Sequence, residues 1–350
     1  MTLDCRYEGE TDVINISENE IMKNWNTSKY KEPLVTIRCM AYNHGQYISS
    51  AIEGFLKQKT TFPFVIFIHD DCSTDNTASI IREYQKRYPN MIHAIFEDEN
   101  QWSKKDGSWE RISRENIHTK YAALCEGDDY WIDEEKLEKQ VGYLERNPEC
   151  AISITNGKVL NLQNEQYESI FQNSEEELFG RENQIITLDN CASIMFPPTA
   201  SYVYRHDAYD KGIDDVPKCF NGDLRIRLYY MTKGYCYYFK DETVVYRKNV
   251  ANSAMTRASK QNRSNAFSRA KNTCEMIDYI DGASGFKHSD ELWKVKLDHL
   301  LTVISNSRKL TKLRDPVCSR AFRQCALPKK LKIIIKIVTP EWLYARLRNG

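Results

Sequence analysis

Two pairs of acidic residues follow short apolar runs in this 350-residue sequence. Asp70 and Asp71 come directly after FVIFIH, and Asp128 and Asp129 follow KYAALCEG. Apolar runs of this length predict buried strands, and an open parallel sheet binds its ligands beyond the carboxyl ends of its strands. Both pairs therefore occupy positions at which a bound ligand is expected.

The second pair belongs to a denser cluster that could hold a cation. Glu126, Asp128 and Asp129 place three carboxylates within four residues, and their mutual repulsion is costly unless a cation is near. Oxygen ligands of this kind suit Mg²⁺ or Mn²⁺, which usually accompany a phosphate-bearing substrate. A solvated acidic loop ahead of a helix is the alternative, and Asp133 is expected to cap that helix.

The first pair also has a structural explanation. The segment DDCSTDNT is rich in helix-capping residues, so Asp70 and Asp71 could fill turn and cap positions, and capping is the favoured role of Asp75. Other chemistry is less supported, because G-x-G-x-x-G, G-x-x-x-x-G-K-[ST], H-E-x-x-H and G-x-S-x-G are all absent. The seven histidines show no ligand spacing, and Arg111 and Arg114 are expected to be exposed in a polar loop.

Alternating strand-like and helix-like segments must position these residues. In the first half of the chain they are expected at 34–39, 46–58, 64–68, 78–88, 92–96, 120–125 and, for the last helix, within 126–148. Further strands follow to about residue 250, including a pair at 235–239 and 243–247, with helices around 188–195 and 222–234. The alternation predicts an α/β fold with a mostly parallel sheet and helices on both faces, followed by polar helices beyond Asn252.

The N-terminal residues and the cysteines bear on location. Residues 1–32 are polar and are expected to form a loosely docked extension. The start of the chain lacks the basic and apolar regions of a signal peptide, and no run approaches the ~20 apolar residues that span a bilayer. Eleven cysteines occur without a C-x-x-C pair, which favours a reducing compartment. We therefore expect a cytoplasmic protein that is neither secreted nor transmembrane.

The C-terminal segment is strongly basic. From Arg308 to Gly350 there are twelve Lys and Arg but two acidic residues, although the whole chain has 49 of each sign. Residues 327–350 mix these cations with Ile, Leu, Trp and Tyr in a stretch suited to lying on an anionic membrane surface. A helix docked on the rest of the protein is the alternative. Nucleic acid is not an expected partner, because the basic residues form no known reading motif.

Three segments together resemble the opening signatures of the family 2 glycosyltransferases. They are LVTIRCMAYNHGQYISSAIEGFLKQ from Leu34, IFIHDDCSTDNTASIIREY from Ile66 and ALCEGDDYW from Ala123, and the similarity continues to about Asn252. The resemblance implies a GT-A fold that binds a nucleotide-sugar. In that family, Met40 and the residues near it would belong to the donor site.

The resemblance implies roles for individual residues. Met40, Tyr42 and Asp71 map to the positions that hold the nucleotide base and ribose. Asp128 maps to the main ligand of a metal ion on the donor diphosphate, and Asp129 is the competing ligand.

The resemblance extends to the acceptor side. Residues 196–205 resemble the acceptor segment, and Asp223 maps to the general base of inverting members, with a helix N-cap as its alternative role. Residues 243–253 resemble the closing strand and loop, which often carries a histidine where this chain has Asn249 or its neighbours. Glu126 also departs from the usual first aspartate of the metal motif.

The sequence thus predicts an extension at 1–32, a GT-A domain at 33–252, a helical region at 253–326 and a membrane-associating segment at 327–350. The expected activity is a metal-dependent, inverting hexosyl transfer with Mg²⁺ or Mn²⁺, from a nucleotide-sugar, UDP-sugars being favoured. The acceptor would be a hydroxyl of a glycan or lipid-linked intermediate in polysaccharide biosynthesis, at the inner face of the cell membrane. A non-catalytic nucleotide-sugar-binding module and a metal-dependent nucleotidyltransferase are the alternatives, although the latter's Gly-rich triphosphate loop is absent.

Overall fold

The chain folds into two compact units that interleave along the sequence. The computed structural model describes residues 15–104, 106–171, 181–193, 197–206, 210–250, 264–307 and 310–339. The first unit comprises 1–185, 195–211 and 233–253, and the second comprises 186–194, 212–232 and 254–350.

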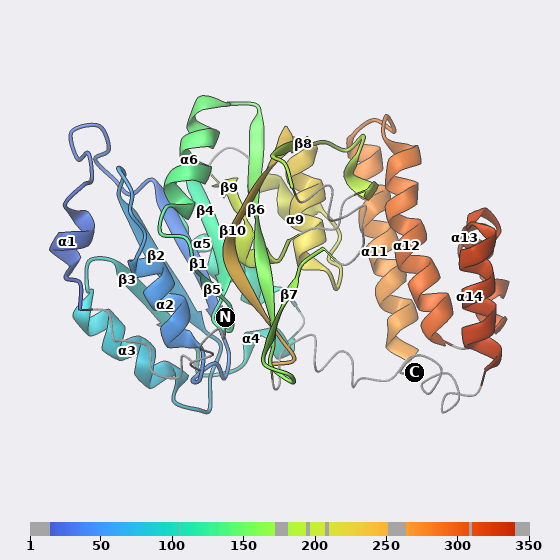
Figure 1. Cartoon of the computed structure of the whole chain (residues 1–350), viewed down its shortest axis with the longest axis horizontal. Coiled ribbons are helices and arrows are strands. Elements are labelled where there is room, and N and C mark those ends of the chain that lie inside the picture. Colours follow the sequence, from blue (N-terminus) through green and yellow to red (C-terminus); the bar gives the residue numbers. More distant parts are fainter. Residues whose placement is uncertain are drawn as a thin grey trace, which may run out of the picture. The chain divides into compact units, whose positions relative to one another are not determined.

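A ten-stranded sheet forms the framework of the first unit (Figure 1). Its strands are β1 (Val35–Ala41), β2 (Phe64–Asp70), β3 (Ile92–Phe96), β4 (Tyr121–Glu126), β5 (Tyr130–Trp131), β6 (Cys150–Asn161), β7 (Gln166–Ser169), β8 (Gln184–Ile186), β9 (Val203–Arg205) and β10 (Tyr235–Lys248). The order is β3-β2-β1-β4-β9-β6-β10-β5, with β7 on β6 and β8 on β10. The ladders β1/β2, β1/β4, β2/β3 and β6/β10 are parallel, and the shorter ladders to β5, β7 and β9 are antiparallel. The predicted α/β fold with a mostly parallel sheet is confirmed.

The two strands expected at 235–239 and 243–247 are one strand, β10. It pairs with β6 along its length, and the register shifts between Phe239 and Glu242 and again before Val244. The polar residues in the middle of β10 suggested a turn, but they form an irregularity in a continuous ladder.

Helices cover both faces of the sheet. α2 (Ile48–Leu56), α3 (Thr77–Arg87) and α6 (Lys136–Arg146) share one core with alternate residues of β1, β2 and β4. On the other face, Met40 of β1 and His69 of β2 both contact Ser113 of α5 (Ser108–Glu115).

The polar loop expected between β3 and β4 contains two helices, which corrects that prediction. They are α4 (Gln101–Lys104) and α5, and α5 carries the i, i+4 pairs Arg111–Glu115 and Arg114–Glu110. Arg114 was expected to be exposed, but its side chain is only 10 % exposed. The segment has few apolar residues, so its helical period is hard to detect in the sequence.

The described part of the N-terminal extension is firmly docked, in contrast to the loose docking expected. α1 (Glu18–Met22) begins with a capping box between Ser17 and Glu20, and Ile21 is buried. Trp25 donates a hydrogen bond from Nε1 to Thr60 Oγ1 at 3.1 Å and packs edge-on against Phe64. Residues 1–14 lie outside the described residues.

The second unit is mainly helical. Its helices are α9 (Gly222–Met231), α11 (Ser264–Ala283), α12 (Ser289–Ser307), α13 (Pro316–Gln324) and α14 (Leu327–Val338). The helix expected at 188–195 is a short 3₁₀ turn at Cys191–Ser193, and Ile194 and Met195 lie outside the described residues. Within the described part of the chain, each helix is too short or too polar to cross a membrane.

Candidate functional site

The ends of three parallel strands lie next to one another in the first unit. The register pairs Ala41 of β1 with Asp70 of β2, and Met40 with Glu126 of β4. The backbone continues this contact beyond the strands, since the N–H of Asp71 donates to Ala41 O at 2.9 Å and the N–H of Gly127 donates to Met40 O at 2.8 Å. The loops that follow β1, β2 and β4 therefore begin at one edge of the sheet, as the sequence predicted.

The loop after β4 is tight and is held by a residue from β10. The N–H of Asp129 donates to Glu126 O at 3.1 Å, which closes the turn. The backbone N–H of Arg247 donates to Asp129 Oδ1 at 2.9 Å, and its guanidinium donates to Asp128 O at 2.8 Å. The Arg247 guanidinium also lies over the Tyr130 ring at 4.3 Å.

The two aspartates of this loop have different surroundings. Asp129 is 2 % exposed, and burial, followed by the charges of Asp128 and Glu126, raises its pKa well above the usual range. The side chain of Asp128 is 15 % exposed, and its Oδ2 lies 3.7 Å from His44 Nε2. Asp128 is therefore the more accessible of the two carboxylates.

Gly127 leaves room for His44 to lie close to the loop that carries Asp128. A Cβ at Gly127 would lie 2.9 Å from His44 Nδ1 and 2.8 Å from Ile48 Cδ1. Any other residue would require the side chains of His44 and Ile48 to shift. His44 Nδ1 is buried and has no hydrogen-bond partner among the described residues.

Asp71 is enclosed by the segment that follows β3. It is fully buried, and its carboxylate accepts the N–H of Gln101 at 2.6 Å and the N–H of Trp102 at 3.1 Å. Asn100 Nδ2 donates to Asp71 O at 3.1 Å. The preceding Asp70 accepts from Ser73 Oγ at 2.5 Å, so it fills a turn position.

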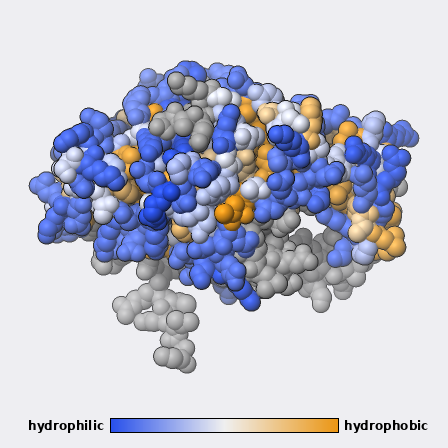
Figure 2. Space-filling view, turned by 90° about the horizontal axis from the view of Figure 1, so that it is seen from above, coloured by the Kyte–Doolittle hydropathy of each residue, from blue (hydrophilic) through white to orange (hydrophobic). Residues whose placement is uncertain are grey.

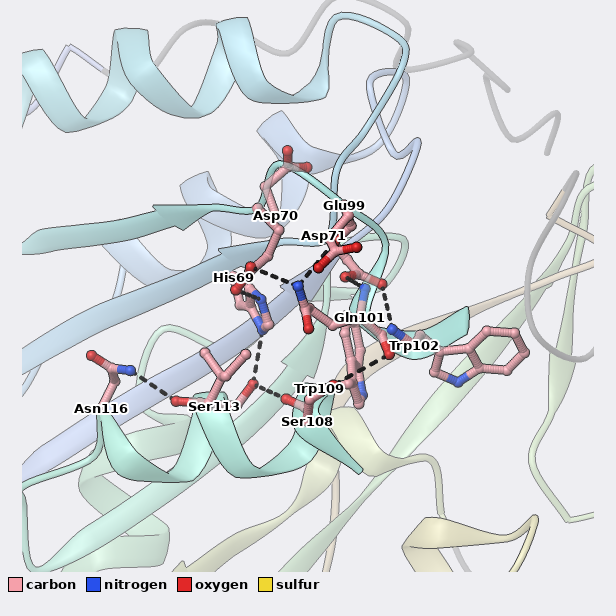
Figure 3. A network of polar contacts seen from close by, with 12 residues as sticks. His69, Asp70, Asp71, Glu99, Gln101, Trp102, Ser108, Trp109, Ser113 and Asn116 are labelled. Atoms are coloured by element: carbon pink, nitrogen blue, oxygen red, sulfur yellow. Dashed lines mark hydrogen bonds and ion pairs between the residues drawn. The ribbon is translucent and has the colours of Figure 1, made fainter. Parts of the chain in front are cut away.

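A buried polar network extends from Gln101, whose N–H donates to Asp71 (Figure 3). Gln101 Nε2 donates to Glu97 Oε2 at 3.0 Å, and Glu97 Oε1 lies 2.9 Å from His69 Nε2. His69 Nδ1 is 3.1 Å from Ser113 Oγ, which also lies 3.0 Å from Met40 Sδ. Burial lowers the pKa of His69, which favours the neutral ring in this chain of contacts.

The remaining predicted residues lie as follows. Met40 is 4 % exposed, and Tyr42, one residue beyond β1, is half-buried. Asp75 accepts the N–H of Thr77, the first residue of α3, at 3.0 Å, but the N-cap of α3 is Asn76, so Asp75 supports the first turn from the position before the cap that was predicted for it. Asp133 accepts the N–H of Glu135 at 2.9 Å at the start of α6.

Asp223 belongs to the second unit. It is half-buried in the first turn of α9, two residues after the N-cap Asn221. Asp223 is thus not the N-cap itself, which was its alternative role. Asn249, at φ 68°, donates from Nδ2 to Asn161 Oδ1 at 2.9 Å and closes the end of β10 onto β6.

Three further residues at this edge were not found in the sequence. Arg247 and His44 contact the loop of Asp128, and Trp102 contacts Asp71. Arg247 lies 119 residues from Asp128 in the chain, so spacing gave no signal. His44 follows β1 closely, and its position after a strand was the signal that could have found it.

The described residues contain no group of three or more His, Cys, Asp or Glu side chains placed to bind a metal ion. This does not argue against Mg²⁺ or Mn²⁺ with a diphosphate, because such ions are usually bound through one or two carboxylates plus substrate phosphates and water. An accessible Asp128 carboxylate beside a second acidic residue fits that donor set.

Comparisons with known proteins agree with this architecture. The family model described as glycosyl transferase family 2 matches residues 37–211, half of the chain. Uncharacterized protein Rv1520 of Mycobacterium tuberculosis is 36 % identical over 184 residues, which cover 52 % of this chain and 49 % of the relative. The putative teichuronic acid biosynthesis glycosyltransferase TuaG of Bacillus subtilis is 33 % identical over 139 residues, 38 % of this chain and 48 % of TuaG. The chain thus spans about half the length of these curated relatives.

Two solved structures share the fold. Residues 1–349 of S. aureus TarS, in complex with UDP-GlcNAc, superpose with a TM-score of 0.50 at 16 % identity, covering 89 % of this chain and 91 % of that one. The mannosyltransferase PcManGT of Pyrobaculum calidifontis, in complex with GDP-Man and Mn²⁺, gives a TM-score of 0.50 at 14 % identity, covering 91 % and 81 %. At these identities the likeness shows a common GT-A-like fold.

Proposed function

Because the chain belongs to glycosyl transferase family 2, we propose that it moves a sugar from a nucleotide-sugar donor to a hydroxyl group of an acceptor. The observation that carries this proposal is the convergence of the loops after β1, β2 and β4, which brings Tyr42, Asp71 and Asp128 to one sheet edge. This is the edge at which open parallel sheets bind ligands.

The donor would be a nucleoside diphosphate sugar, with UDP-sugars favoured. TarS has been solved with UDP-GlcNAc and PcManGT with GDP-Man, and this chain shares their fold. The name of TuaG refers to teichuronic acid biosynthesis, which supports a glycan or lipid-linked acceptor in polysaccharide biosynthesis. A hexose is the sugar that we propose.

Asp128 would hold Mg²⁺ or Mn²⁺ on the donor diphosphate, and its partial exposure supports this over Asp129. One oxygen of Asp129 already accepts the N–H of Arg247, so Asp129 orients the loop. When bound, the metal ion would neutralise charge on the departing diphosphate.

Asp223 would act as the general base. The first turn of α9 favours a negative charge at this position because helix N–H groups point towards it. The carboxylate takes the proton of the acceptor hydroxyl while the oxygen attacks the anomeric carbon. The bond from that carbon to the diphosphate breaks on the opposite face, so the nucleoside diphosphate leaves and the configuration inverts.

The exposed face of α14 supports a position at an anionic membrane surface. Leu327, Leu331, Ile334, Ile335 and Val338 are between 38 and 68 % exposed and share one side of the helix. Ile333 points the other way, is 4 % exposed and packs into the helical core of the second unit. In Figure 2 an apolar group of residues lies on the end of the surface where Figure 1 places α13 and α14.

The charge of this helix supports the same partner. Lys330 and Lys332 flank the apolar side at 100° per residue, and Lys329 and Lys336 add to the charge, with no acidic residue in α14. A mixed apolar and basic surface suits anionic headgroups better than a neutral protein surface. On the Ile333 side the helix is docked on the other helices of the second unit.

Calorimetry and a transfer assay together test the function. UDP should bind the wild type in Mn²⁺ and at least about tenfold more weakly in EDTA or after Asp128→Ala, since a charged contact is lost. Asp98→Ala removes an exposed acid beyond β3 and serves as the matched control. Asp223→Asn should keep UDP affinity and lose about 10²-fold or more in transfer.

The outcomes separate the rival functions. Equal UDP affinity with and without metal would remove the metal assignment, and undiminished transfer by Asp223→Asn would assign the base to another carboxylate. Nucleotide binding without turnover, across a panel of donors and acceptors, would favour a binding module.

A further inference from the structure

We propose that Trp102 is the platform on which the base of the donor nucleotide stacks, and that Asp71 positions Trp102. This inference rests on the proposed nucleotide-sugar donor. It gives Asp71 a different task from the direct nucleotide contact that the family resemblance implies.

The hydrogen bonds of Asp71 support a positioning role. Its N–H donates to Ala41 O, its C=O accepts from Asn100, and its two carboxylate oxygens accept the N–H groups of Gln101 and Trp102. The residue is 0 % exposed. Every polar group of Asp71 is therefore engaged within the protein, and the carboxylate fixes α4 to the end of β2.

Hydrogen bonds hold the segment that carries Trp102. Gln101 is 7 % exposed, and its Nε2 donates to Glu97 Oε2 at 3.0 Å and to Glu99 O at 3.1 Å. Asn100 Oδ1 accepts the N–H of Ser103 at 2.8 Å. A satisfied buried network of this kind restricts the backbone that carries Trp102.

Trp102 itself faces outward. Its side chain is 39 % exposed, and Figure 3 shows the indole pointing away from the polar network that holds its backbone. A large exposed aromatic ring on a fixed backbone loses little freedom when a ligand packs on it. Asp71 thus contacts the backbone of two segments that each carry an aromatic residue, since its N–H donates to Ala41 O, next to Tyr42, and its carboxylate accepts the N–H of Trp102.

The chemistry of this surface suits a nucleobase. Stacking on an aromatic side chain is favourable for every base, because each has a flat π face, and alanine substitution costs about 1–3 kcal/mol per base. The diphosphate would extend towards Asp128 and would not need the indole. Loss of the indole ring should therefore weaken the binding of nucleotides and leave the binding of inorganic pyrophosphate unchanged.

Isothermal titration of the full chain with UDP, GDP and pyrophosphate in Mn²⁺ tests this. Trp102→Ala should bind UDP and GDP about 5- to 150-fold more weakly, and pyrophosphate with wild-type affinity. Trp102→Phe should recover most of the loss, because a phenyl ring also stacks. Tyr279→Ala, which removes an aromatic side chain 40 % exposed on α11, is the control and should bind all three ligands normally.

A double-mutant cycle separates positioning from contact at Asp71. Asp71→Asn replaces one acceptor oxygen by an N–H₂ donor that cannot accept the Trp102 N–H, so nucleotide affinity should fall as in Trp102→Ala. Added to Trp102→Ala, it should cause little further loss, whereas a direct contact of Asp71 with the nucleotide would give additive losses. Melting temperatures of all variants identify any that fail to fold, and Trp102→Phe then supplies the measurement.

Three results would overturn the inference. They are wild-type UDP affinity in Trp102→Ala, equal weakening of UDP and pyrophosphate, and additive losses in the cycle. If the wild type binds pyrophosphate and neither nucleotide, the proposed donor fails together with this inference. If the wild type binds UDP and the Trp102 variants do as well, the donor stands and the inference alone fails.

Discussion

Lys136 is fully buried in the first unit, although its sequence position at the start of an amphipathic helix is ordinary for a lysine. Its Nζ donates to Gln140 Oε1 at 2.7 Å and lies 4.2 Å from the centre of the Trp131 ring. Burial lowers the pKa of Lys136 from its usual value to about 7. The folded protein therefore releases this proton near neutrality, whereas the unfolded chain holds it to about pH 10.

This difference predicts a pH dependence of stability. Between about pH 7 and 10 the unfolded state binds one more proton, so the contribution of Lys136 becomes more favourable to folding as pH rises. The free energy of unfolding of the wild type relative to Lys136→Met should increase by up to about 1.4 kcal/mol per pH unit in this window. Urea unfolding at pH 7, 8 and 9 measures it.

A control separates this effect from the titration of other groups. Lys57→Met removes an exposed lysine at the end of α2 and should leave the pH profile of the wild type unchanged. Parallel profiles for wild type and Lys136→Met would show that Lys136 titrates normally.

Single residues of the site could be predicted where local sequence determines them. The positions of Asp71 and Asp128 at the strand ends were predicted because each lies within two residues of the end of an apolar strand, and that of Asp75 because it precedes a helix. Trp102 and Arg247 were missed because their contacts depend on tertiary pairing, across 31 and 119 residues respectively. Such contacts leave no pattern in a single sequence.

At the scale of elements, α14 has two apolar sides. Ile333 and Ile337 pack with α12 and α13 in the helical core, and the other side leaves Leu331, Ile334 and Ile335 exposed. The sequence predicted a basic amphipathic segment at 327–350, and the structure shows which residues of its helix remain exposed after the helix has packed. The second apolar face of α14 is in contact with water, and an exposed apolar patch of this kind often marks an interaction site.

This face predicts binding to anionic vesicles that depends on both apolar and charged residues. The triple variant Leu331→Ser, Ile334→Ser, Ile335→Ser should bind phosphatidylserine-containing vesicles roughly 100-fold more weakly, since each half-exposed side chain contributes about 1 kcal/mol on burial. Salt should weaken wild-type binding, because each lysine near an anionic surface adds about 1 kcal/mol. Vesicle sedimentation measures both effects.

The control is Phe286→Ser, which removes an aromatic ring 71 % exposed in the turn after α11. It should sediment with vesicles as the wild type does. Undiminished sedimentation of the triple variant, with an unchanged melting temperature, would place any membrane contact elsewhere on the chain.

Prediction at this scale depended on how periodic each element is. α2, α3 and α6 were located because apolar residues recur at helical spacing, and β1, β2 and β4 because they are continuous apolar runs. α5 was missed because ion pairs at i, i+4 and a few contacts to the sheet stabilise it. A helix stabilised in this way lacks the regular spacing of apolar residues by which helices are predicted from a sequence.

At the scale of the whole first unit, β10 joins segments that are distant in the chain. Val244 and Val245 pair with β5, and Arg247 reaches from the end of β10 to the loop that carries Asp128. The guanidinium lies over Tyr130 and 5.1 Å from the Tyr47 ring centre. The long strand thus holds the acidic loop through Arg247 and through its pairing with β5, which directly follows that loop.

Removing the Arg247 side chain should weaken metal binding at the proposed Asp128 site before it unfolds the protein. Arg247→Ala should raise the Mn²⁺ concentration needed for half-maximal UDP binding by about tenfold, since a hydrogen bond to a charged group is worth about 1.5–3 kcal/mol. Arg247→Lys should recover part of this, because it keeps the charge but lacks the planar fork. Titrating Mn²⁺ at fixed UDP measures the shift.

The neighbouring Lys248→Ala is the matched control, because Lys248 pairs with Glu168 on β7 and does not contact the loop of Asp128 among the contacts described. An unchanged Mn²⁺ requirement in Arg247→Ala would show that the loop is held by its own turn and by the Arg247 backbone alone.

The bond between Arg247 and Asp128 also sets an order of events during synthesis. The two residues are 119 positions apart, and ribosomes add about 5–20 residues per second, so roughly 6–24 s pass between their appearance. Throughout that interval the nascent chain carries the acidic loop without the arginine that braces it. The matched family segment ends at residue 211, so translation must continue well past it before the proposed donor site has its full set of contacts.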